Sequence, residues 1–140
     1  MSFMKQSTVN RGAGFCFLGV AGLFVICIMT QIFIAGMAIF TDSSYWHSHI
    51  VFVRIFELFP IVMLLLSFIG KISTFLRWMS VLLLVFVFAQ YFTANFDGAG
   101  AVHPLIAAVM LWVSIVVTVH AKRSMFPKKE HVQPEGVEIQ

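Results

Sequence analysis

Five ionisable side chains that could do chemistry lie at or inside strongly apolar segments of this chain. They are His47, His49, Arg54, Glu57 and His103. Imidazole nitrogens are common metal ligands, and a planar guanidinium pairs well with a carboxylate. Such groups are costly inside a membrane, so they usually face a bundle interior, a partner or a cofactor. We expect the function of the chain to depend on this cluster.

The composition predicts an integral membrane protein. Hydrophobic residues make up 60% of the 140 residues, charged residues make up 11%, and the mean hydropathy is +0.96. A soluble fold of this size could not bury so much apolar surface. The net charge is +3, but the basic residues separate the apolar segments and form no stripe, so nucleic acid is not an expected partner.

Four apolar segments predict four transmembrane helices embedded in a lipid bilayer. Each segment approaches the roughly 20 residues that cross a hydrocarbon core. Short links between them favour an all-α, up-down antiparallel four-helix transmembrane bundle with the second and fourth spans on a diagonal. We expect one domain over residues 1–126 and a flexible cytoplasmic tail over residues 127–140. The predicted spans are residues 15–40, 50–69, 78–94 and 104–121.

The basic residues between the spans predict the orientation of the bundle. The two links on one side carry Asp42 and Asp97 and no lysine or arginine. The positive-inside rule therefore places both termini in the cytoplasm. All lysines and arginines outside the spans lie on the other side, together with the termini: Lys5, Arg11, Lys71, Arg77, Lys122, Arg123, Lys128 and Lys129.

Arg54 and Glu57 are spaced three residues apart on the second span, which is close enough for an ion pair. Such a pair could simply neutralise itself inside the bundle. A buried pair is nevertheless costly compared with apolar side chains, so it could also serve a ligand or a partner. His47 and His49 have a comparable alternative as interfacial polar residues, and at least one of them is expected to be only that.

Histidines at one membrane level on diagonal spans could ligate a single metal from opposite sides. Haem suits this arrangement, because its ring fills the bundle interior and two imidazoles bind the iron axially. Arg54 would pair with a propionate, and Glu57 would orient Arg54 or a ligand. Gln31 and Gln90 lie on the first and third spans and either pack across helices or contact the cofactor. Zinc fits less well, because the sequence offers no third and fourth ligand at suitable spacing.

Four short motifs accompany the candidate ligands: Gln31 to Gly36, Trp46 to His49, Gln90 and His103-Pro104. Together they resemble a small bacterial four-span membrane family of unknown function. The layout is also similar to one half of haem A synthase, a four-helix unit with haem-ligating histidines at the outer ends of its second and fourth helices. This resemblance implies a multi-pass protein of the bacterial cell membrane that binds haem b through His103 and either His49 or His47.

The chain departs from haem A synthase in two respects. It lacks the extracytoplasmic cysteine pair of many synthases, because Cys16 and Cys27 both lie in the first span. It also has one histidine pair, whereas the synthase uses two halves. The resemblance therefore implies haem binding, with electron transfer or haem handling, and argues against complete synthase activity.

Two other functions are consistent with the sequence. The chain could be a cofactor-free accessory protein whose buried Arg54–Glu57 pair sets helix packing or binds a membrane protein partner or a second copy. It could also be a subunit of a proton-coupled or solute carrier, although its length and the absence of predicted broken helices disfavour this. No hydrolytic or transferase motif is present, so whether the chain is an enzyme stays open.

Overall fold

A computed structural model describes residues 10–126 as a chain of helices. Four helical units are long and apolar enough to cross a membrane, because α2 and α3 form two parts of one 25-residue unit. The chain is a multi-pass membrane protein, as the composition predicted. The predicted tail at residues 127–140 lies outside the described residues. The elements are α1 (Arg11–Phe40), α2 (Tyr45–Phe56), α3 (Phe59–Ile69), α4 (Thr74–Asn95) and α5 (His103–Met125).

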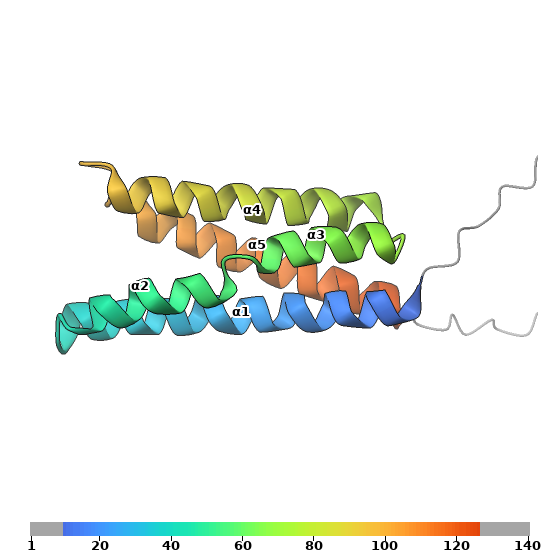
Figure 1. Ribbon diagram of the computed structural model, residues 1–140, viewed down its shortest axis with the longest axis horizontal. Coiled ribbons are helices and arrows are strands. Elements are labelled where there is room, and N and C mark those ends of the chain that lie inside the picture. Colours follow the sequence, from blue (N-terminus) through green and yellow to red (C-terminus); the bar gives the residue numbers. More distant parts are fainter. Residues whose placement is uncertain (1–9, 127–140) are drawn as a thin grey trace, which may run out of the picture.

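Successive spans run in opposite directions, so the links alternate between two ends of the bundle (Figure 1). We call the end with residues 41–44 and 96–102 the histidine end. The opposite end, where α1 begins, α3 meets α4 and α5 stops, is called the basic end. Helix α1 packs along α2, α3 and α5, and α4 packs along α3 and α5. The second and fourth spans therefore lie on a diagonal, as predicted.

Capping side chains make two helices begin earlier than the apolar segments indicate. The Asn10 side chain accepts hydrogen bonds from the backbone N–H groups of Gly12 and Ala13, at 3.1 and 3.4 Å. Ser73 accepts one from Leu76 N–H at 3.4 Å. These bonds satisfy N–H groups that have no partner in the first helical turn. Both α1 and α4 start four residues before the predicted spans. The predicted bounds follow hydropathy, which indicates the part of a helix that crosses the membrane and not its full length.

The second span is broken at Glu57 and Leu58, between α2 and α3. Pro60 has no N–H to donate to the Phe56 carbonyl, and its ring crowds that carbonyl. Ile61 N–H instead donates to Leu58 O at 3.0 Å. The second span is present as one membrane-crossing unit, as predicted, whereas the expectation that no span is broken is wrong at the centre of this unit. Pro60 was the sequence signal for this break.

Helix α2 lies at the edge of the core. Phe56 is its one buried residue, and the Phe56 ring meets Phe24 of α1 edge-on at 5.8 Å between ring centres. Helix α2 packs along α1, whereas α3 packs along both α1 and α4. The core is therefore densest toward the basic end, and polar side chains connect the helices at the histidine end. Its largest buried side chains are Phe17, Phe24, Phe56, Ile28, Met63, Leu76 and Leu83.

Candidate functional site

His49 and His103 face each other across the histidine end, with their ring centres 6.4 Å apart. Both side chains are half-buried. His49 lies on the face of α2 that also carries Phe56, the residue that enters the core. His103 is the first residue of α5, followed by Pro104, whose missing N–H has no helical partner at that position anyway. The structure thus brings together one histidine from each of the two diagonal spans.

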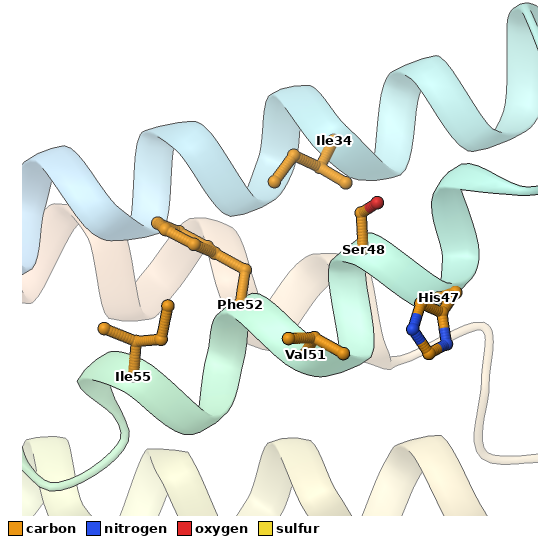
Figure 2. Close-up of a pocket in the computed structure, with 6 residues that line it drawn as sticks. All are labelled: Ile34, His47, Ser48, Val51, Phe52 and Ile55. Atoms are coloured by element: carbon orange, nitrogen blue, oxygen red, sulfur yellow. The ribbon is translucent and has the colours of Figure 1, made fainter.

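His47 lies on the other side of α2 and is exposed. It lines a shallow, mostly apolar groove of about 300 Å³ between α1 and α2, and His103 is not among the residues that line this groove (Figure 2). Of the two candidates on this helix, the structure places His49 and not His47 opposite His103. The groove is lined by Ile34, His47, Ser48, Val51, Phe52 and Ile55.

The imidazole of His103 is held by α4. Its Nδ1 lies 3.1 Å from Thr93 Oγ1 and 3.2 Å from the Gln90 backbone oxygen. The Thr93 hydroxyl donates to Ala89 O at 2.9 Å, so its oxygen can accept from His103 Nδ1–H. In the tautomer that carries the proton on Nδ1, the ring donates to these oxygens and keeps a lone pair on Nε2.

The side-chain amide of Gln90 also lies against the His103 ring. When its Oε1 accepts from Ala107 N–H at 2.7 Å, its Nε2 lies 2.7 Å from His103 Nδ1 and 3.1 Å from His103 Nε2. Thr93 is buried and was not predicted as a site residue. Its spacing of three residues from Gln90, on one helix face, was the signal that could have identified it.

Gln31 connects α1 to the same region. Its Nε2 donates to the His49 backbone oxygen at 2.8 Å. Gln31 Oε1 and His49 Nδ1 are buried, and neither has a hydrogen-bond partner within residues 10–126. Buried polar atoms without partners are rare and usually mark a water, an ion or a catalytic group. We call Gln31, His49, Gln90, Thr93 and His103 the histidine cluster.

Glu57 and Arg54 are not part of the histidine cluster, and the ion pair that their spacing permits is not formed in the structure. Glu57 accepts a hydrogen bond from the Tyr91 hydroxyl, across from α2 to α4. Arg54 is exposed, and no ion pair links it to Glu57 in the part of the chain that the structure describes. Spacing on a helix permits a pair, but here the helix break directs the carboxylate toward α4. Tyr91 is therefore a polar partner that the sequence pattern did not identify.

The donor set of the histidine cluster restricts the ligands it could hold. Within residues 10–126, no three histidine, cysteine, aspartate or glutamate side chains lie close enough together to hold a metal ion. Two imidazoles alone do not complete a structural zinc site, which takes four ligands. They do suffice for an iron whose remaining ligands come from a porphyrin.

Comparison with known proteins gives one similarity. Searches of curated proteins and of solved structures gave no match to the chain. A comparison with models of protein families does match one segment of the chain, residues 31–99. This segment begins at Gln31, includes His49, Glu57 and Gln90, and ends before His103. The predicted resemblance to a family of unknown function is confirmed over this segment, whereas the resemblance to haem A synthase stays a prediction. Residues 31–99 match the model of a family of unknown function (DUF6220).

Proposed function

We propose that the chain binds b-type haem at the histidine end, with His49 and His103 as axial ligands. The observation that carries this proposal is the 6.4 Å separation of the two ring centres. A metal held about 2 Å from each of two opposed imidazole nitrogens sets the ring centres about 6 Å apart. The observed spacing therefore matches one iron between two imidazoles without a large movement of α2 or α5.

The surroundings of both rings support the same ligand. Metal-binding histidines usually donate their other ring N–H to a carbonyl or hydroxyl, and His103 has Gln90 O and Thr93 Oγ1 in that position. The Gln90 amide nitrogen, which lies 2.7 Å from His103 Nδ1 and 3.1 Å from Nε2, would turn aside when iron binds at Nε2. The unpartnered His49 Nδ1 gives the second imidazole a free nitrogen.

The edge position of α2 supports the binding of a flat ring. Because Phe56 is the one residue that α2 buries, a small shift of this helix sacrifices little packing. Arg54 supplies an exposed guanidinium for a propionate, and its planar donors match a carboxylate. Haem with two axial imidazoles would supply one-electron redox chemistry, so we propose electron transfer or haem handling in a bacterial cell membrane with both termini in the cytoplasm.

A visible spectrum of the purified protein tests this proposal. We expect the protein, purified in detergent after expression with excess haem, to show a Soret band and sharp bands on reduction. Pyridine extraction should then give about one haem b per chain. A colourless protein that is helical by circular dichroism would rule out the haem proposal, because misfolding could not then explain the missing cofactor.

A second candidate function is binding of a membrane protein partner through Arg54. The observation that favours it is an exposed guanidinium within a membrane-spanning unit, with no ion pair to Glu57. A charge at that depth is stabilised by an acidic group or by reaching the interface. We expect Arg54→Leu to abolish a co-purifying partner or a homo-oligomer while haem content stays unchanged. If Arg54→Leu instead removes haem and no partner, Arg54 belongs to the cofactor site.

A further inference from the structure

Five cationic residues lie on the helix ends and the turn that form the basic end of the bundle, and they come from three helices and one turn. The acidic residues of the described part of the chain are Asp42, Glu57 and Asp97, and all three lie away from this end. The five cations therefore have no acidic side chain near them among residues 10–126. We call them the basic cluster: Arg11, Lys71, Arg77, Lys122 and Arg123.

Local contacts hold the basic cluster together. Asn10 N–H donates to Gly70 O at 3.2 Å, which ties the start of α1 to the turn between α3 and α4. In that turn Lys71 adopts a left-handed backbone conformation with φ of 50°. At the other side of α1, Phe15 meets Phe126 edge-on at 5.7 Å between ring centres, which ties α1 to the end of α5. The cations are therefore fixed on neighbouring elements and cannot separate freely.

Arg77 is the most constrained member of the basic cluster. Its guanidinium carbon lies 4.1 Å from the centre of the Phe68 ring, a cation–π contact that restrains the group. Its Nε is buried and has no hydrogen-bond partner in the described part of the chain. A restrained guanidinium with unused donors is suited to a planar or tetrahedral oxyanion, such as a carboxylate or a phosphate.

We propose that the basic cluster binds the headgroups of anionic phospholipids in the adjoining leaflet. The apolar surface beside the cluster favours a lipid over a soluble anion. Trp78 follows Arg77 in sequence and is 65% exposed, and Phe75 is also exposed, so acyl chains can lie against these rings while the phosphate meets the cations. Basic residues next to membrane spans attract anionic lipids by charge complementarity. This proposal is independent of haem binding.

Trp78 provides a direct reporter for the bound lipid. The full chain with Trp46→Phe and Trp112→Phe would be reconstituted in bilayers that contain either brominated phosphatidylglycerol or brominated phosphatidylcholine, each diluted in unlabelled phosphatidylcholine. Bromine quenches only a tryptophan that it contacts. We expect phosphatidylglycerol to quench Trp78 at several-fold lower mole fraction than phosphatidylcholine. Lys71→Gln with Arg77→Gln should abolish this preference, because each cation near the surface contributes about 1 kcal/mol, or about five-fold, to the attraction of anionic lipid.

Controls separate this proposal from general charge effects and from a soluble ligand. Asp97→Asn changes the charge by one unit at the histidine end and should leave the preference unchanged, while added salt should weaken it. Equal quenching by the two lipids in the parent chain would overturn the proposal. Millimolar inorganic phosphate that restores Trp78 fluorescence as effectively as unlabelled phosphatidylglycerol would also overturn it, because the cluster would then bind free phosphate and not a lipid.

Discussion

Replacing either His49 or His103 with alanine is expected to abolish haem binding, whereas His47→Ala is expected to leave it intact. The ring centres of His49 and His103 are 6.4 Å apart, and His47 lines a groove on the other side of α2. Loss of one of two axial imidazoles removes one iron–nitrogen bond. The vacated coordination position is then open to water or to an added base. The measurement is the haem content and reduced visible spectrum of each purified variant, compared at equal protein concentration.

Added imidazole distinguishes loss of a ligand from loss of the fold. In the His49→Ala or His103→Ala protein, imidazole in the buffer should restore part of the reduced spectrum by filling the vacated position. Helix content measured by circular dichroism should match the parent in all three variants. A His47→Ala protein without haem, together with a His49→Ala protein that keeps the parent spectrum, would contradict the proposed ligand pair.

Removing the Tyr91 hydroxyl is expected to destabilise the protein by about 1–3 kcal/mol, because Glu57 then lacks its hydrogen-bond donor inside the membrane-spanning unit. Tyr91→Phe keeps the ring and deletes one oxygen, so packing changes little. Glu57→Gln removes the charge that makes this bond strong. In a double-mutant cycle, the two changes together should cost little more than the larger single change, as expected for partners in one interaction. The free energy of unfolding in detergent is the measured quantity.

Arg54→Gln provides the matched control for this cycle. The structure gives Glu57 a hydrogen bond to Tyr91 and no ion pair to Arg54. The changes at Arg54 and Glu57 should therefore be nearly additive, in contrast to those at Tyr91 and Glu57. Strong coupling between Arg54 and Glu57, with additivity between Tyr91 and Glu57, would restore the ion pair that helix spacing predicted.

The four spans were predictable from the sequence, and so was the end of the bundle at which the histidines lie. A membrane span depends on a local run of mostly apolar residues. The sequence contains four such runs, and they correspond to the four membrane-crossing units among the described residues. The short links then place the starts of the second and fourth spans at one end, so histidines near those starts had to lie at one level. Gln31 could likewise be expected to hydrogen-bond across helices, and it donates to the His49 carbonyl.

Helix ends and the break in the second span were only partly predictable. Hydropathy does not report capping, so it missed the starts that Asn10 and Ser73 give to α1 and α4. Pro60 signalled a break, but proline is tolerated in membrane helices when neighbouring groups satisfy the freed backbone. Whether the helix kinked, broke or continued was therefore decided by its packing.

The sequence by itself determined that the chain has four membrane-spanning units and that histidines from the second and fourth units meet at one end. Only the tertiary structure decided that His49 faces His103 and that Thr93 joins the cluster, and it assigned Tyr91 to Glu57 in place of Arg54. The physical reason is that composition fixes which segments enter the membrane, whereas the direction of a side chain depends on how each helix is rotated against its neighbours. His47 and His49 are two residues apart, so the packing of α2 along α1 turned one inward and the other outward.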